Sequence, residues 1–204
     1  MKNEQETTSG SNRFTARLAP YMLKAGLENI EAAYELAKSA HREQKRESGE
    51  RYFEHPKAVA NIIIDELGIR DNWELIVSGL LHDVLEDSFM LTEERIRKNF
   101  GRRIALWLKL LTKNPKEGHH QRLLESGMWQ PWFVKLVDRL HNMRTLGACK
   151  PEKQKKQVLE TEKYYLPLAD TLLKKIPKKY RAGAERLKAE LEKVCAECRA
   201  GLEP

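Results

Sequence analysis

The chain has 204 residues, of which 41% are hydrophobic and 33% charged, and its formal net charge is +7. This balance predicts one soluble domain with a sizeable core. No apolar run reaches the roughly 20 residues that a membrane span needs. The start lacks the apolar segment of a signal peptide, and three cysteines are too few for a disulfide framework. We therefore expect a cytoplasmic protein with a disordered polar tail over residues 1–14 and a single domain over residues 15–204.

The first half of the chain shows helical periodicity. Apolar residues and His41 share one stripe of a helix over residues 27–41. Pro56 suits the first turn of a helix over residues 55–67. Asp71 and Glu74 form a pattern like a capping box before the apolar run of residues 72–87. That run predicts a helix through the middle of the domain.

The second half is predicted to be helical as well. Thr92 begins a helix that ends near Gly101, and another covers residues 104–112. Residues 113–121 are polar and predict a mobile loop. Pro131 opens the next helix, and two long charged helices follow over residues 152–175 and 178–199. No segment alternates like a half-buried strand, so we predict one all-α domain of eight to nine helices.

Most of the positive charge lies in one segment. Residues 150–181 hold ten Lys or Arg and four Asp or Glu, a net charge of 10 − 4 = +6. Such a surface favours an anionic partner. The chain lacks the spacing of a zinc finger, an RNA-binding aromatic motif or a leucine zipper. We therefore expect a solvated basic face rather than a groove for nucleic acid.

Ionisable residues interrupt the most apolar part of the chain. His82 and Asp83 follow a run of buried character, where a charged pair is costly without a partner or a metal ion. On a continuous helix, Glu86 and Asp87 fall one turn further on the same faces. The sequence thus predicts an imidazole and three carboxylates along a narrow arc.

Two further residues complete this group. His55 precedes Pro56, and Asp138 stands among apolar residues of a predicted helix. Taken singly, each can be a loop histidine or a surface ion pair. Taken together, two imidazoles and two carboxylates form a mixed nitrogen and oxygen set that suits manganese, iron or zinc.

The sequence motifs around these residues resemble those of a known family. His82-Asp83 matches the doublet of the HD-type metal phosphohydrolases. The segments HDVLED, DRLHNMRTL and the upstream HP occur in the order found in the hydrolase domain of RelA/SpoT-type alarmone enzymes. The resemblance covers residues 32–173. It predicts a small, stand-alone alarmone hydrolase.

This resemblance implies a set of roles. It implies a metal-dependent 3′-pyrophosphohydrolase that converts guanosine 3′-diphosphate 5′-di- or triphosphate, (p)ppGpp, into GDP or GTP and pyrophosphate. The implied cofactor is one divalent ion per chain, typically Mn(II), on His55, His82, Asp83 and Asp138. Glu86 and Asp87 match the acidic pair needed for hydrolysis. The residues that match substrate contacts are Arg46, Ser48, Lys113, Asn142 and Thr145.

This chain departs from the family sequence in the loop that, in the family, flanks the nucleotide base. Glu47 replaces a lysine, Glu43 a glycine and Arg51 a proline. These changes leave open an adenosine alarmone, or the 2′-phosphate of NADPH, as the substrate. A non-catalytic module that binds a nucleotide or RNA is a second alternative, and a homo-oligomer is compatible with the sequence.

Other candidate residues favour structural roles. Cys195 and Cys198 form a single CxxC in a charged helix, which is insufficient for a zinc site. His119 and His120 fall in the polar loop and are expected to be solvated. His41 is expected to be a core histidine.

Overall fold

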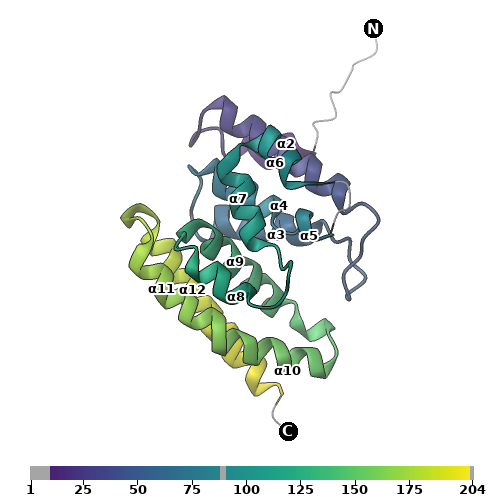
Figure 1. Cartoon of the computed structure of the whole chain (residues 1–204), viewed down its shortest axis with the longest axis vertical. Helices are drawn as coiled ribbons and strands as arrows, with labels where there is room; N and C mark the ends of the chain where they lie inside the picture. Colours follow the sequence, from purple (N-terminus) through teal and green to yellow (C-terminus); the bar gives the residue numbers. More distant parts are fainter. Residues whose placement is uncertain (1–9, 88–90, 203–204) are drawn as a thin grey trace.

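The computed structural model describes residues 10–87 and 91–202, except for the side chain of Asp87. These residues form twelve α-helices and no extended strand (Figure 1). The helices are α1 (Gly10–Ala16), α2 (Lys24–Ala40), α3 (Glu54–Asn61), α4 (Trp73–Leu81), α5 (Val84–Asp87), α6 (Glu93–Phe100), α7 (Arg102–Leu111), α8 (His119–Glu125), α9 (Trp129–Arg144), α10 (Pro151–Glu160), α11 (Leu166–Lys175) and α12 (Lys178–Ala200). The all-α prediction is confirmed.

The described helices outnumber the eight to nine that we expected, for four reasons. The apolar run of residues 72–87 is divided into α4 and α5 by a turn at His82 and Asp83. Helix α1 occupies part of the expected tail, and α8 lies partly in the expected loop. A π-helical turn (Thr161–Tyr165) separates α10 from α11, so the helix expected over residues 152–175 counts as two, although its helical course is continuous.

Helix α1 corrects the predicted boundary of the tail. The Phe14 ring is buried and lies 5.3 Å from the ring of Tyr34. The Thr15 hydroxyl donates to the Glu31 carboxylate at 2.6 Å. These contacts bind residues 10–16 to α2, so the tail prediction fails for residues 10–14. Residues 1–9 lie outside the described part of the chain.

Helix ends follow local capping chemistry, with one correction. The Asn72 side chain accepts from the backbone N–H of Leu75 at 3.1 Å, so Asn72 caps α4. Asp71, the expected cap, instead pairs with Lys179. Thr92 caps α6 as predicted, and α6 ends at Gly101, whose φ of 89° favours glycine.

Helices α4 and α9 form the centre of the molecule. Residues 75–81 of α4 and 131–140 of α9 are all buried. Helix α4 packs against α2, α3, α7 and α9. At Gly79 of α4, an added Cβ would lie 2.9 Å from Ile63 Cδ1 and 3.7 Å from the Cα of Ala60, so α4 passes close to α3 at this point. The ionisable residues gather at this C-terminal end of α4.

The C-terminal helices form a layer on the far side of α9. Helices α11 and α12 pack on α9 and on each other, and the rod of α10 and α11 runs along α12 (Figure 1). The buried apolar residues of both halves belong to one core. Within the described residues, no helix has the length and apolar character to cross a membrane.

Candidate metal centre and adjoining cavity

Four predicted side chains converge where α3, α4 and α9 meet. His55 comes from α3, His82 and Asp83 from the turn after α4, and Asp138 from α9. The two Nε2 atoms of His55 and His82 lie 3.1 Å apart. Asp83 Oδ2 lies 3.1 Å from His82 Nε2, and Asp138 Oδ1 lies 3.2 Å from His55 Nε2. The structure therefore brings together the four residues predicted as metal ligands.

These separations fit a shared divalent ion. The nitrogen–oxygen contacts across the group run from 3.1 to 3.6 Å. An ion about 2.1 Å from each donor would hold neighbouring ligands about 3.0 Å apart in octahedral geometry and about 3.4 Å apart in tetrahedral geometry. His55, His82 and Asp138 are buried and can each offer one donor atom to a common point. The donor set suits a transition metal of the manganese, iron and zinc group.

Both imidazoles are oriented by hydrogen bonds behind them. His82 Nδ1 donates to the carbonyl of Gly79 at 2.9 Å. His55 Nδ1 lies 2.8 Å from His141 Nδ1, which also accepts from Arg46 at 3.3 Å. Because His141 Nδ1 is the acceptor, His55 Nδ1 carries the hydrogen. Each Nε2 atom therefore faces the centre and is the atom that would bind a metal ion.

The carboxylates are held in the same way. Lys135 Nζ donates to Asp138 Oδ2 at 2.9 Å, and Asn142 Nδ2 donates to Asp138 Oδ1 at 2.6 Å. The Tyr52 hydroxyl donates to Asp83 Oδ2 at 2.8 Å. Every ligand candidate thus has at least one hydrogen-bond partner besides the other ligand candidates.

The charges in this centre depend on one another. Although burial disfavours both carboxylates, Lys135 and the two histidines hold the pKa of Asp138 well below its usual range. Burial lowers the pKa of His82, but the Asp83 carboxylate outweighs this effect and raises that pKa to about 10. Burial, aided by His55 and Arg46, lowers the pKa of His141 to about 3. His141 is therefore neutral, consistent with its role as an acceptor.

A cavity of about 520 Å³ opens beside this centre. It contains four of the residues predicted to contact substrate, namely Arg46, Ser48, Asn142 and Thr145. The Arg46 guanidinium donates to Asn142 Oδ1 at 2.9 Å and contacts the Thr145 hydroxyl at 3.4 Å. Through His141 and Asn142, the same arginine is connected to His55 and Asp138. The cavity and the metal centre thus form one continuous polar network.

Glu47 also lines this cavity, but it is paired. Its carboxylate accepts from Lys153 Nζ at 2.6 Å, across 106 residues of sequence. Hydrogen bonds from Lys153 and Cys149 lower the pKa of Glu47. The negative charge introduced at this position is therefore partly balanced by a lysine of the basic segment.

The predicted acidic pair has a different setting from the one that we inferred. The turn at His82 and Asp83 breaks the continuous helix on which that inference relied, and Glu86 N–H donates to Asp83 O at 3.0 Å. The Glu86 side chain is exposed and accepts from the backbone N–H of Lys113 at 3.3 Å. Glu86 and Lys113 are therefore neighbours. The Asp87 side chain lies outside the described part of the structure.

Three supporting residues were not identified from the sequence. Lys135 has the appearance of a surface lysine, yet its side chain is only 2% exposed. Its spacing of three from Asp138 places both on one face of α9, which was the available signal. The contacts of Tyr52 and His141 join segments far apart in sequence, so spacing offers no comparable signal.

Two other predictions have clear outcomes. His119 is buried rather than solvated. It is the first residue of α8, and its Nε2–H donates to the carbonyl oxygen of Leu110 at 3.0 Å. His41 is a core histidine as expected, stacked on Tyr52 at 4.7 Å. Cys195 and Cys198 are free thiols within the C-terminal layer.

The chain is similar in sequence to known proteins. A family model described as an HD domain matches residues 33–120. The guanosine-3′,5′-bis(diphosphate) 3′-pyrophosphohydrolase of Aquifex aeolicus is 38% identical over 174 residues, which cover 81% of this chain and 23% of that protein. The bifunctional (p)ppGpp synthase/hydrolase SpoT of Escherichia coli K12 is 33% identical over 186 residues, which cover 85% and 24%.

A solved structure shares the fold. The structure of a metazoan SpoT ortholog that hydrolyses ppGpp aligns with a TM-score of 0.63 at 22% identity, over 86% of this chain and 97% of that one. This likeness confirms the HD-type all-α fold. The chain spans about a quarter of the length of these two curated relatives.

Proposed function

Since the chain carries an HD domain and is homologous to the SpoT and RelA (p)ppGpp hydrolases, we propose that it is a divalent-metal-dependent (p)ppGpp 3′-pyrophosphohydrolase. The products would be GDP or GTP and pyrophosphate. This proposal rests mainly on one observation. Four side chains that can donate electron pairs to a metal ion converge at one point, and a polar cavity large enough for a nucleotide lies next to them. We place the reaction in the cytoplasm.

The proposed cofactor is one Mn(II) ion on His55, His82, Asp83 and Asp138. Such an ion polarises phosphoryl oxygens and lowers the pKa of a bound water towards neutrality. The protein's own contribution is orientation. Lys135 and Asn142 fix the Asp138 carboxylate, and Tyr52 fixes that of Asp83. These bonds hold the donor atoms in place before substrate arrives.

The adjoining cavity would hold the nucleoside. Arg46 is held by Asn142, Thr145 and His141, so its planar guanidinium is positioned in advance. Ser48 lies in the same wall. A substrate with about six negative charges would also be attracted by the net charge of +7. These groups provide binding and orientation rather than bond cleavage.

Hydrolysis requires a proton transfer as well as a bond exchange. Water oxygen attacks the phosphorus attached to the ribose 3′ oxygen, the bond between that phosphorus and the 3′ oxygen breaks, and the 3′ oxygen takes up a proton. We assign the relay of this proton to Glu86 and Asp87, on the resemblance alone for Asp87. Glu86 is exposed at the end of α5 and is held by the N–H of Lys113, so its carboxylate is accessible to water.

The test is direct. Protein purified with manganese is given ppGpp, and the products are separated by ion chromatography. We expect equal amounts of GDP and pyrophosphate. Asp83→Ala should be inactive, whereas Asp65→Ala, which removes an exposed carboxylate paired with Arg17, should keep activity. Release of orthophosphate instead of pyrophosphate, or equal turnover in both variants, would contradict the proposal.

The sequence of this chain leaves open whether the base of the substrate is guanine or adenine. Glu47 lines the cavity, and its carboxylate can accept from the amino group of guanine or of adenine. A panel of ppGpp, ppApp and NADPH at equal concentrations distinguishes the three substrates. Faster turnover of ppApp or NADPH would replace the guanosine assignment while leaving the metal centre unchanged.

A further inference from the structure

The cavity beside the metal centre is lined by two separate parts of the chain. The loop over residues 44–52 supplies one part of the lining, and Ala148, Cys149 and Lys153 supply another from the segment after α9. Lys153 lies in the first turn of α10, and 47% of its side chain is exposed. The basic segment over residues 150–181 therefore reaches this cavity through Lys153.

The Lys153 ammonium is held in position and keeps donors for a ligand. Its Nζ donates to Glu47 Oε1 at 2.6 Å, and both residues line the cavity. An ammonium has three N–H donors, of which Glu47 uses one. Because both side chains are about half exposed, the pair itself is weak and water can reach Nζ. A phosphate oxygen can therefore replace water on Lys153 while Glu47 still holds the ammonium.

The other two cations of the lining are placed differently. Arg46 belongs to the polar network that leads to the metal centre. Lys153 and Glu47 make no hydrogen bond to that network within the described residues. Among the same residues, no ion pair holds the side chain of Lys45. Lys153 is thus a cation that is fixed by an ion pair and lies outside the network of the metal centre.

The proposed substrate needs such a cation. In the proposed reaction the 3′-diphosphate lies at the metal centre, where its bond to the ribose breaks. The 5′-diphosphate is attached to a different ribose carbon and is not altered by the reaction. A hydrogen bond from an ammonium to a phosphate oxygen is charge-assisted and roughly twice as strong as a neutral one. A positioned lysine in the cavity wall would therefore bind this second diphosphate.

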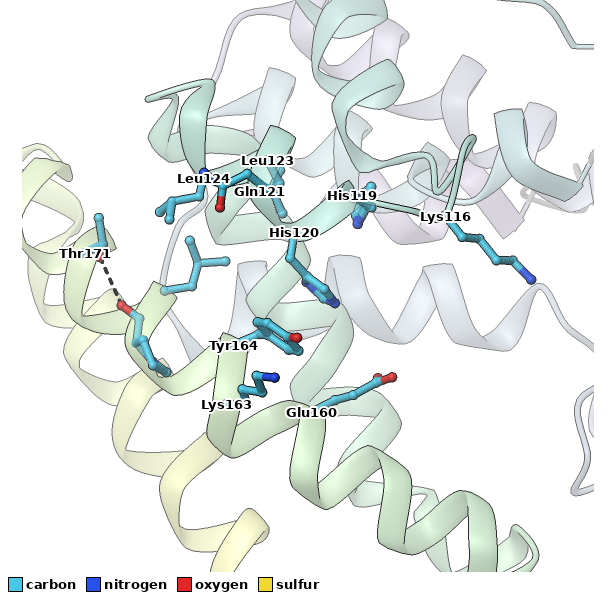
Figure 2. Close-up of a pocket in the computed structure, with 13 residues that line it drawn as sticks. Lys116, His119, His120, Gln121, Leu123, Leu124, Glu160, Lys163, Tyr164 and Thr171 are labelled. Carbon is cyan, nitrogen blue, oxygen red and sulfur yellow. Dashed lines mark hydrogen bonds between the residues drawn. The ribbon is translucent and has the colours of Figure 1, made fainter.

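A second cavity, between α8 and the rod of α10 and α11, does not offer a comparable arrangement. Its volume is about 560 Å³. His120 covers the ring of Tyr164, with ring centroids 4.4 Å apart, and Lys116 and Lys163 lie apart from each other (Figure 2). The two lysines of this lining therefore do not converge on one anion. The cavity beside the metal centre is the one in which α10 presents a positioned cation.

We propose that Lys153 is a specificity-determining residue that binds the 5′-diphosphate of the nucleotide, and that Glu47 positions it. The proposal rests on the proposed function, because it takes the 3′-diphosphate to lie at the metal centre. Since the 5′-diphosphate is unchanged in the reaction, the contact stabilises the bound substrate and the transition state equally. It should therefore affect KM rather than kcat.

The experiment compares ligands with and without the 5′-diphosphate. Calorimetry measures the affinity of the manganese-loaded full chain for GDP and for guanosine, and steady-state kinetics compare ppGpp with guanosine 3′-diphosphate. Lys153→Met removes the charge and keeps the aliphatic stem. Lys156→Met is the matched control, because Lys156 is an exposed, ion-paired lysine of α10 that lines neither cavity. Lys45→Met tests the other lysine of the lining.

We expect Lys153→Met to weaken GDP binding and to raise KM for ppGpp by about fivefold or more, while kcat stays within about twofold. Its values for guanosine and guanosine 3′-diphosphate should stay unchanged, and Lys156→Met should match the wild type throughout. The proposal would be overturned by no GDP binding in the wild type, by equal GDP affinities of Lys153→Met and Lys156→Met, by an equal loss for guanosine, or by a loss confined to Lys45→Met. The expected GDP binding without hydrolysis of ppGpp would contradict the proposed function alone.

Discussion

The metal centre and the loop over residues 44–52 are neighbours, but they are built differently. His55, His82 and Asp138 are at most 5% exposed, and each comes from a helix or a helix end. Glu47 and Ser48 are exposed on the loop, which is closed by bonds from Arg46 N–H to Glu50 O and from Tyr52 N–H to Gln44 O. A buried helical scaffold fixes the first region, whereas the second is a short loop closed by local backbone hydrogen bonds.

This difference bears on which part of the site can vary. A change in the metal centre disturbs several buried hydrogen bonds at once, so it affects both folding and chemistry. The exposed side chains in and beside the loop meet solvent and, at most, a surface ion pair. The chain departs from the RelA/SpoT pattern at three such exposed residues, Glu43, Glu47 and Arg51. We therefore expect large effects from the centre and small, substrate-dependent effects from these three positions.

The largest effect is expected from Asp138→Ala. The substitution removes one donor and leaves Lys135 as a buried charge without its carboxylate. Changes to residues behind a metal ligand typically cost 10- to 100-fold in affinity or activity, so loss of a ligand should cost more than about 100-fold in kcat/KM. Steady-state kinetics with ppGpp measure this, with Asp65→Ala as the control. A loss below tenfold would show that Asp138 is not a ligand.

The second effect concerns Lys135→Met. Removing one member of a buried ion pair costs about 3–5 kcal/mol, because the other charge stays buried. Without metal, Asp138 then lacks its main cation, whereas a bound ion would compensate for the loss. Thermal unfolding should therefore show a larger manganese-induced rise in Tm for Lys135→Met than for the wild type. Lys109→Met, at an exposed pair with Glu93, is the control. An equal rise in all three proteins would argue against a metal beside Asp138.

The third effect is a dependence of metal affinity on pH. In the metal-free protein, burial lowers but Asp83 raises the pKa of His82, to about 10. A divalent ion must displace this proton, so the apparent affinity should rise by up to about tenfold per pH unit between pH 6 and 8. Manganese titrations followed by electron paramagnetic resonance measure the free ion directly. An affinity that is constant over this range would contradict protonation of His82.

The smallest effect is expected from Glu47→Lys. The substitution breaks the surface pair with Lys153, which should change Tm little. It places a cation in the cavity wall, so KM for ppGpp should fall a few-fold while kcat stays within about twofold. Glu43→Lys, on an exposed residue that does not line the cavity, is the matched control. If both variants leave KM and the preference between ppGpp and ppApp unchanged, Glu47 does not contact the base.

Much of the fold followed from periodicity and capping. Residues 178–199 were predicted within one residue of α12, because a long amphipathic helix after Pro177 has strong signals at both ends. Helices α1 and α8 were missed because each has seven residues and mostly polar composition. Their formation depends on tertiary contacts, such as those of Phe14 and His119, which local patterns do not contain.

The candidate site divides in the same way. The ligand candidates could be predicted from the sequence, because burying an ionisable side chain in an apolar segment costs free energy and therefore indicates a special role. The break in the helix at His82 and Asp83 could not be predicted, since a continuous helix and a helix interrupted by a turn have the same apolar pattern. Lys135 was not predicted because most lysines are exposed, although its spacing of three from Asp138 indicates that the two side chains can pair on one helix face.

The central claim is that His55, His82, Asp83 and Asp138 hold one divalent ion. The most direct measurement is the metal content of the protein by inductively coupled plasma mass spectrometry. The protein is purified without chelator, exposed to manganese and then desalted. We predict one divalent ion per chain in the wild type and in Asp65→Ala, and almost none in folded Asp138→Ala. A folded wild-type protein without metal, or an Asp138→Ala protein that retains one ion per chain, would contradict the account.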